Sequence, residues 1–423
     1  MPPTTTVHQA YRFALDPTPR QQGRLASATG GSRFAYNWGL ELVKRRLDAR
    51  AAGEQVLVPW TLAALRREWN QAKRQVAPWW AENSKEAYSS GLDALARALK
   101  NWADAKHGRR RGARMGFPRR KRKGRCRDAC RFTTGAIRVE ADRHHVVLPR
   151  LGQIKTHEST RKLARRLEQG TARLLAATVS RQAGRWYVSF TCQVQRPVRR
   201  PQRPQARIGV DVGIRDLAVC SDGRRVPNPA PLQAAQRRLR RLSRQLARRR
   251  GPIASDGARR EPSAGWRQTK GRLAVAHARV ADVRRNAQHQ LTSALATTYG
   301  VVVVERLNVA GMLGNRRLAR RLADAGFGEL RHQLGYKTIW AGGKLIEAGT
   351  WYPSSKTCSG CGHVKAKLPL SERTYRCEDP GCGLVLDRDE NAARNLAALV
   401  RTAWRREWSP GVARRLETLG ERT

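Results

Sequence analysis

The chain lacks several features that would place it in familiar protein classes. It has no run of eighteen apolar residues, which excludes a transmembrane helix, and the residues after Met1 do not read as a signal peptide. It also lacks a phosphate-cradling P-loop and a Ser/His/Asp arrangement, so neither of these chemistries competes for its function. We therefore expect a cytoplasmic protein in a reducing compartment, with no membrane partner.

Acidic residues are scarce relative to basic ones. The chain has 33 Asp and Glu against 84 Lys and Arg, so its formal net charge at pH 7 is +51. Such a charge destabilises a compact state by self-repulsion unless a polyanion neutralises it. We expect a large nucleic-acid partner, bound with a steep salt dependence, and association with the nucleoid. The length of 423 residues and hydrophobic content of 40% allow two or three folded domains.

Four of the eight cysteines form a metal-binding pattern. Cys358 and Cys361 make one pair and Cys377 and Cys382 the other, and a glycine follows each pair. This spacing predicts a ribbon that holds a structural Zn²⁺ through four thiolates, in preference to disulfides or free thiols. The second pair has four intervening residues where two are usual, and we expect Pro380-Gly381 to absorb them in a turn.

The other cysteines carry weaker signals. Cys126 and Cys130 lie in a basic stretch with no second pair nearby, so a second zinc site there is a minor alternative. Cys192 and Cys220 lie in strand-like segments and are expected to be small buried residues.

The first half of the chain predicts a small β-barrel with a helical insertion. Residues 7–15 alternate as an opening strand, and residues 131–195 contain further short strands with a helix at 158–169. Between them, residues 17–125 show three helical stripes of apolar and aromatic residues. We expect the aromatics to form a core, although some could stack on bases. The Pro/Arg-rich segment 196–206 predicts a domain boundary.

A strongly basic loop at residues 106–127 interrupts the helical region. Its glycines and Pro118 break the periodicity, and its charge cannot be buried. It could be a solvated linker, but the interleaved Met115 and Phe117 favour a segment that becomes ordered on a phosphate backbone. The candidate nucleic-acid-binding residues are Arg109, Arg110, Arg111, Arg119, Arg120, Lys121, Arg122 and Lys123.

The second half carries three carboxylates in a pattern typical of a nuclease sheet. Asp211 lies inside an apolar strand, Glu305 ends a later apolar strand, and Asp389 opens a helix after the cysteines. A carboxylate inside an apolar strand is costly unless it binds something. This order indicates an RNase H-like sheet that gathers acids around two divalent ions. Each acid alone could be structural: Asp211 and Glu305 in ion pairs with arginine, and Asp389 as a helix cap.

Other segments of the second half are predicted from helical periodicity. Residues 232–250 and 266–298 predict an antiparallel helical pair with arginine-rich outer faces and a mobile tip, which could gate the acidic site. Residues 316–340 predict one amphipathic helix. The helix that starts at Asp389 is expected to reach about Arg401, followed by a loose charged tail.

Several stretches of this sequence resemble one known family. They are G-V-D-V-G-I-R-D-L-A, V-V-V-E-R-L-N-V-A-G-M, T-W-Y-P-S-S-K-T-C-S-G-C-G and C-G-L-V-L-D-R-D-E-N-A-A-R-N-L, with R-F-A-Y-N-W-G-L and G-F-P-R-R-K nearer the N-terminus. The chain resembles TnpB, the transposon-encoded RNA-guided nuclease related to compact type V CRISPR effectors. It departs from the family in E-R-L-N, where many relatives have an acid after the Glu, and in the wide C-x4-C.

The resemblance implies a multidomain α+β fold. Its parts would be a wedge-like β-barrel (1–16 and 127–197), an inserted helical recognition domain with the basic loop (17–126), a linker (198–206), an RNase H-like RuvC α/β domain (207–349 and 384–403), an inserted zinc ribbon (350–383) and a flexible tail (404–423).

The resemblance also implies the site residues. Asp211, Glu305 and Asp389 would be the catalytic acids that bind Mg²⁺, as two ions. Asp387 is the near alternative, and Asp389 is preferred because it stands two residues before Asn391-Ala392-Ala393.

The implied activity is that of an RNA-guided DNA endonuclease. A guide RNA would pair with the target strand of double-stranded DNA beside a short recognised motif, and the acids would cut with Mg²⁺. A monomer with one RNA is favoured. The alternatives are a type V CRISPR effector with the same chemistry, a nuclease-inactive RNA-guided repressor, a guide-free resolvase-like nuclease and an RNA-packaging protein. The acids disfavour the repressor and the packaging protein, and the long basic N-terminal half disfavours the resolvase.

Overall fold

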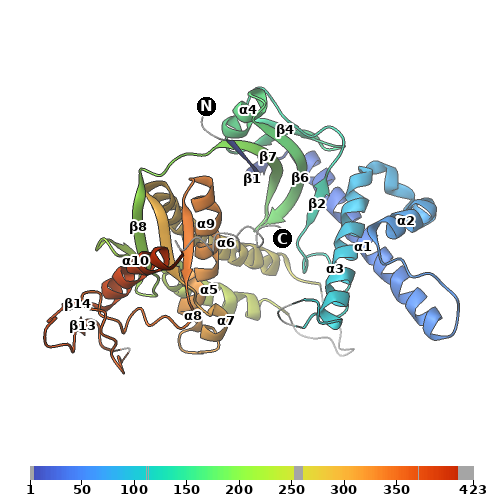
Figure 1. Ribbon diagram of the computed structural model, residues 1–423. Helices are drawn as coiled ribbons and strands as arrows, with labels where there is room; N and C mark the ends of the chain where they lie inside the picture. The colour runs from blue at the N-terminus through green and yellow to red at the C-terminus, as the bar shows by residue number, and fades with distance from the viewer. Residues whose placement is uncertain (1–3, 111, 113, 252–260, 370, 408–423) are drawn as a thin grey trace. The chain divides into compact units, whose positions relative to one another are not determined.

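The computed structural model describes residues 4–407 apart from 111, 113, 252–260 and 370, with side chains as far as residue 399. The chain divides into two compact units, Thr4–Arg196 and Pro197 onward, and each has its own sheet and core (Figure 1). None of the helices among the described residues is long and apolar enough to cross a membrane.

The N-terminal unit contains a seven-stranded sheet in the order β2-β6-β7-β1-β5-β4-β3. Its strands are β1 (Thr4–Asp16), β2 (Ala129–Phe132), β3 (Arg138–Val139), β4 (His145–Leu148), β5 (Gly152–Thr156), β6 (Ala172–Gln182) and β7 (Arg185–Pro197), with α4 (Arg161–Glu168) between β5 and β6. In the part of the chain that the structure describes, no pairing joins the edge strands β2 and β3, so a closed barrel stays a prediction. Cys130 and Cys192 are buried in this core.

The segment between β1 and β2 is helical. It comprises α1 (Pro19–Ala51), α2 (Leu62–Val76), the 3-10 turn η1 (Pro78–Glu82) and α3 (Lys85–Lys106). Thr18 begins α1 with a capping box: its hydroxyl accepts the N–H of Gln21, and the Gln21 side chain accepts the N–H of Thr18. The stripe residues pack into one core, in which Trp69 stacks on Tyr88 at a centroid separation of 5.0 Å, as expected for core aromatics.

The basic loop is anchored to this helical core. Phe117 packs edge-on against Trp102 at 5.0 Å, and the side-chain amide of Asn37 pairs with the backbone N–H and C=O of Lys121 at 2.8 and 2.9 Å. Protein contacts therefore already hold Phe117. The expected ordering of the basic segment on a phosphate backbone stays a prediction.

The C-terminal unit contains a five-stranded sheet in the order β10-β9-β8-β11-β12. Its strands are β8 (Arg203–Asp211), β9 (Asp216–Cys220), β10 (Arg225–Pro227), β11 (Tyr299–Glu305) and β12 (Lys344–Ala348). Strands β8, β11 and β12 are parallel, and β9 and β10 are antiparallel additions. The long apolar run of β11 fits this central position, since both of its faces are covered.

Helices cover both faces of this sheet. Leucines of α6 (Ala264–Thr298) and α9 (Phe327–Trp340) pack on one face, and α10 (Arg388–Glu407) packs on the other (Figure 1). The expected helical pair is present as α5 (Pro231–Arg248) and α6, which share a small core, but its tip residues 252–260 lie outside the described residues.

Some predicted boundaries are wrong. Residues 316–340 form two helices, α8 (Ala319–Ala325) and α9, because Gly326 adopts a left-handed conformation (φ 67°) and ends α8; the short α7 (Val309–Met312) precedes them. Helix α10 continues to Glu407, beyond the expected Arg401, and the rest of the predicted tail lies outside the described residues. The last residues of the predicted 198–206 linker belong to β8.

Helices α1 and α3 are in backbone contact at Gly91. A Cβ on Gly91 would lie 2.0 Å from the carbonyl oxygen of Ser32, whereas a Cβ on Gly23 of α1 would meet no atom within 4 Å. We expect Gly91→Ala to destabilise this unit by about 1–3 kcal/mol through overpacking. Gly23→Ala should stabilise it by about 0.5–1 kcal/mol through helix propensity. Calorimetric melting of the two variants tests this, and equal melting temperatures would contradict the contact.

Candidate carboxylate site and cysteine cluster

Asp211 and Glu305 lie at the same end of two neighbouring parallel strands. Val210 of β8 pairs with Val304 of β11, so the next residue of each strand, Asp211 and Glu305, share that end of the sheet. Because paired residues project to the same face, both carboxylates lie on one side of the sheet.

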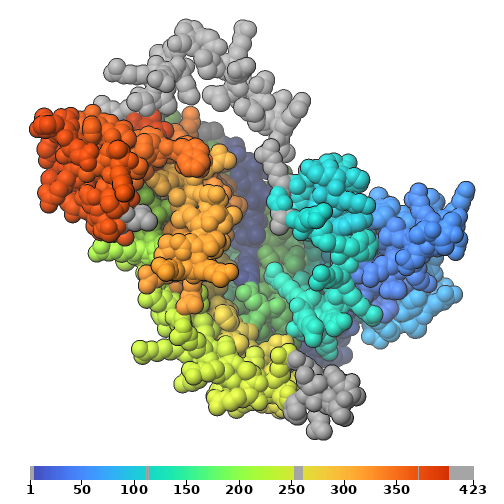
Figure 2. Space-filling model, turned by 90° about the horizontal axis from the view of Figure 1, so that it is seen from below, coloured from blue at the N-terminus to red at the C-terminus, as the bar shows by residue number. Residues whose placement is uncertain are grey.

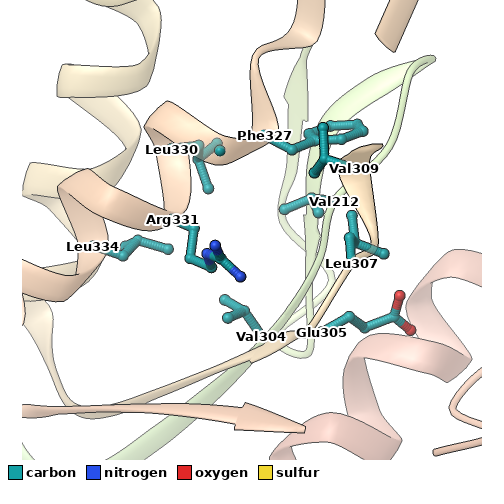
Figure 3. A pocket seen from close by; sticks show the side chains of 10 residues that line it. Val212, Val304, Glu305, Leu307, Val309, Phe327, Leu330, Arg331 and Leu334 are labelled. Carbon is teal, nitrogen blue, oxygen red and sulfur yellow. The ribbon is translucent and has the colours of Figure 1, made fainter. Parts of the chain in front are cut away.

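Helix α10 covers that side. A Cβ on Gly209 would lie 1.9 Å from the carbonyl oxygen of Ala393, so the helix backbone rests directly on β8, and Val303 packs against Leu396. Gly209 and Val303 each precede an acid by two residues and therefore share its face. An apolar cleft lies on the opposite face of the sheet. Figure 3 shows the Glu305 carboxylate directed away from this cleft and towards α10, the red-tinted helix.

The first turn of α10 contains Asp389, and Asp387 caps it. Asp389 stands four and seven residues before Ala393 and Leu396, the spacing of one helix face, and that face rests on the sheet. The Asp387 carboxylate accepts the backbone N–H of Asp389 and of Glu390 at 3.0 and 3.1 Å. The capping role considered for Asp389 therefore belongs to Asp387.

Electrostatics also separates these acids. Burial, and then the charges of Glu305 and Asp389, raise the pKa of Asp211 well above its ordinary value. The pKa of Asp387 is instead lowered. Partial burial acts to raise this pKa, but the hydrogen bond from Arg225, 2.7 Å away, and two backbone N–H groups outweigh it.

Two of the three predicted acids form no ion pair among the described residues. Among the described residues, neither Asp211 nor Glu305 forms an ion pair, which argues against the structural alternative; Asp389 has Arg373 at 3.9 Å. Carboxylate oxygens are the ligands that Mg²⁺ prefers, and a divalent ion would relieve the repulsion that raises the Asp211 pKa. The residues thus fit such an ion, although the side chains do not gather as tightly as the cysteines: in the described chain, only the cysteines bring three or more candidate ligand atoms within 4.8 Å of one another.

Three further polar residues hold this region together. The Ser354 hydroxyl, on a residue that is 3% exposed, donates to a carboxylate oxygen of Glu305. Asn391 and Asn395 of α10 both donate to the carbonyl of Thr357, at 2.7 and 2.6 Å, and Asn391 also accepts the N–H of Ser359. Sequence reasoning assigned no role to these residues, although the i, i+4 spacing of two asparagines on one helix face was a usable signal.

The four cysteines of the predicted ribbon converge. The sulfur of Cys358 is 3.7 Å from that of Cys382, and the sulfur of Cys361 is 3.6 Å from that of Cys377. Tetrahedral thiolates about 2.3 Å from one Zn²⁺ would be about 3.8 Å apart, so the cluster can hold such an ion. The N–H of Cys382 bonds to the carbonyl of Asp379 at 3.1 Å and closes a turn over Pro380-Gly381, which absorbs the extra length as expected.

The segment around the cluster is short and has its own small core. Strands β13 (Thr374–Arg376) and β14 (Val385–Asp387) form a hairpin, and Tyr375 is buried among the cysteines. Figure 2 shows this orange-red segment as a rounded lobe at the edge of its unit. Cys126 and Cys130 do not belong to any comparable cluster in the described chain, and burial raises the pKa of Cys130.

The predicted nucleic-acid-binding residues differ in solvent exposure and in their contacts with the rest of the protein. Arg109, Arg110, Arg119, Arg120, Arg122 and Lys123 are exposed, although Arg109 has Asp104 at 3.5 Å. Lys121 is half-buried with its ammonium 3.9 Å from the Tyr36 ring centroid, so it is engaged within the protein. Arg111 lies outside the described residues.

The C-terminal unit therefore combines two acids at adjacent strand ends, a helix that brings a third acid, and a cysteine cluster. This arrangement is typical of enzymes that hold metal ions through carboxylates. Three family profiles match: a probable transposase (OrfB_IS605) at residues 189–316, a Cas12f1-like TNB domain at 327–396 and a helix-turn-helix domain at 1–51. The last description does not fit the structure, in which residues 4–51 form one strand and one 33-residue helix.

Full-length relatives show the family. A Mycobacterium tuberculosis protein named "Putative RNA-guided DNA endonuclease" is 43% identical over 409 residues, which is 92% of this chain and 86% of the relative. An Escherichia coli K12 protein of the same description, InsQ, is 29% identical over 406 residues and 92% of each chain. The Cas12f1 chain of a complex with sgRNA and target DNA has the same fold, with a TM-score of 0.50 and 13% identity over 93% of this chain and 99% of that one. This chain belongs to the TnpB family.

The cysteine cluster predicts a single bound metal ion that Cys361→Ser should release. Because three thiolates hold the ion more weakly than four, we expect the metal content per chain to fall and the lobe to become sensitive to protease. Cys126→Ser is the matched control and should retain the metal. Elemental analysis of the purified proteins measures this. Full metal content in Cys361→Ser would contradict the assignment.

Proposed function

We propose that this protein is an RNA-guided DNA endonuclease that cuts DNA at the carboxylate site of its C-terminal unit. Family membership supports the activity, since the relatives carry that description. The assignment of this activity to particular residues rests on one observation: Asp211 and Glu305 lie at adjacent strand ends under the first turn of α10. In this proposal, residues 207–349 and 384–403 are an RNase H-like RuvC domain, and 350–383 are a ribbon that binds a structural Zn²⁺.

The catalytic residues in this proposal are Asp211, Glu305 and Asp389. Their carboxylates would hold Mg²⁺, as two ions, which supply activation of a water molecule and stabilisation of the leaving 3′-oxygen. Ser354 would orient Glu305 through its hydrogen bond. Asp387 is assigned to capping α10, so its loss should weaken the placement of Asp389 without removing a ligand.

The partners in this proposal are a guide RNA and a double-stranded DNA target. A polyanion would compensate the net charge of +51, and a structured RNA bound to one protein chain would supply it. The exposed arginines of the basic loop are proposed to contact phosphates, with Lys121 the weakest candidate since it is already engaged. The helical and strand-rich parts of the N-terminal unit would read a short motif beside the target, and base pairing would supply the sequence specificity.

The guide is tested by purifying the protein from cells that also carry its native flanking DNA and sequencing the RNA that accompanies it. We expect one discrete RNA with a variable segment, and Mg²⁺-dependent cutting of DNA that matches this segment. RNase treatment should abolish the cutting. Cutting that persists without RNA would favour a guide-free nuclease instead.

The carboxylate site is tested by Asp211→Asn. We expect cleavage to fall at least about a hundredfold, because the lost charge stabilisation is worth several kcal/mol. The melting temperature without divalent ions should be unchanged or higher, since the substitution removes a like charge beside Glu305 and Asp389.

The matched control is Asp282→Asn on α6. Asp282 pairs with Arg285 at 3.1 Å on the surface, where such pairs contribute little, so both cleavage and melting should match the parent protein. Normal cleavage by Asp211→Asn would overturn the assignment of the site.

A further inference from the structure

The segment after β12 leaves the sheet beside the carboxylates. Ala348, the last residue of β12, pairs with Glu305, so residues 349–355 begin at the same end of the sheet as the acids. The N–H of Tyr352 bonds to the carbonyl of Gly349 at 3.0 Å, which closes a tight turn with Thr350 and Trp351 at its tip.

Hydrogen bonds tie the C-terminal side of this turn to the site. Ser354 donates its hydroxyl hydrogen to Glu305, and Asn395 of α10 donates to the Ser354 carbonyl at 2.8 Å. The Tyr352 hydroxyl donates to the Asn395 carbonyl at 3.2 Å. The turn is therefore a support that hydrogen bonds tether to the carboxylate site.

Trp351 stands out on this support because it is 93% exposed, more than any other large apolar residue in the described chain. Its side chain has no aromatic or cationic partner among the described ring contacts, whereas Trp69 and Trp186 are 5% and 3% exposed. A tethered backbone that presents a whole indole to solvent offers a flat apolar surface at low entropic cost.

We propose that Trp351 is a stacking platform for a nucleobase of the DNA strand that enters the carboxylate site. This inference rests on the proposed function. Trp351 stands three positions before Ser354, which touches Glu305, so at most about 11 Å of chain lies between them. A nucleotide next to the scissile phosphate can therefore reach the indole. Stacking is tolerant of sequence, because every base has a π-face, and this suits an enzyme whose target is chosen by its guide.

The surroundings of Trp351 favour a nucleobase over a protein partner. Residues 349–357 contribute no other exposed large apolar side chain, so the indole is isolated and not part of a contiguous apolar stretch. Protein interfaces present apolar patches of several hundred square ångströms, which one side chain cannot supply. The exposed Arg306, directly after Glu305, adds a positive charge suited to a phosphate backbone.

The stacking is tested with the protein–RNA complex and a target duplex that carries 5-iododeoxyuridine at successive positions around the mapped cut. Irradiation of this photoprobe links it to aromatic side chains that stack on it. In the Asp211→Asn background, which leaves the DNA intact, we expect a cross-link from one position to the peptide that contains Trp351.

Single-turnover cleavage gives the second readout. Trp351→Ala should slow cleavage at limiting DNA by about 5- to 150-fold, the range expected for losing one stacked base, and Trp351→Phe should restore most of the rate. Ile339→Ala is the matched control, since Ile339 is a 65% exposed apolar residue of the same unit that precedes the opposite end of β12, and its rate should be unchanged.

The outcomes separate this inference from the proposed function. If the parent complex does not cut matching DNA, both are overturned. If it cuts and Trp351→Ala cuts equally fast, or the probe links elsewhere, only the stacking is overturned. Equal defects in Trp351→Ala and Trp351→Phe, or a change of sedimentation in Trp351→Ala, would assign Trp351 to folding or to a protein interface and also overturn it.

Discussion

The close approach of α10 to β8 is the contact on which the carboxylate site depends. A side chain at Gly209 would collide with the Ala393 carbonyl, so glycine on the strand and alanine on the helix permit the two backbones to touch. This contact brings Asp389 over the strand ends that carry Asp211 and Glu305. Backbone contact is stiff, because neither partner can relax by changing a rotamer, and it suits a site whose acids repel one another.

The same helix organises the segment that leads to the cysteine cluster. Two asparagines one turn apart on α10 hold backbone groups of residues 354–359, and Ser354 in that segment holds Glu305. The segment that leads to the cluster is therefore linked to Glu305 through one network of hydrogen bonds. The residues before Cys358 are tethered on one side by the cluster and on the other by α10.

The carboxylate site carries negative charge, whereas the chain as a whole is strongly positive. The chain as a whole is strongly basic, yet Asp211, Glu305 and Asp389 form a local concentration of negative charge that raises the pKa of Asp211. A polyanion suits the basic surface and a divalent cation suits the acids. Both kinds of partner belong to the proposed function, and each would compensate a repulsion between like charges of the protein.

Much of the site could be predicted because its signals are local in the sequence. The paired cysteines with turn glycines, the apolar strands that contain or end in an acid, and the Thr18 capping box depend on spacing and residue type alone. The division of 316–340 into two helices was missed, because periodicity is insensitive to one residue such as Gly326 that adopts a left-handed conformation. The contact of Phe117 with Trp102 was not predicted, since the two residues are fifteen positions apart across a loop.

The sequence by itself identified the candidate residues of the site: three carboxylates, four cysteines and a large excess of basic residues. Only the tertiary structure decided which acid faces the sheet and which caps the helix, that Ser354 donates a hydrogen bond to Glu305, and that Trp351 is exposed to solvent. The physical reason is that composition and spacing are properties of a single segment, whereas strand register, the packing of a helix on a strand and the exposure of a side chain depend on segments distant in the chain.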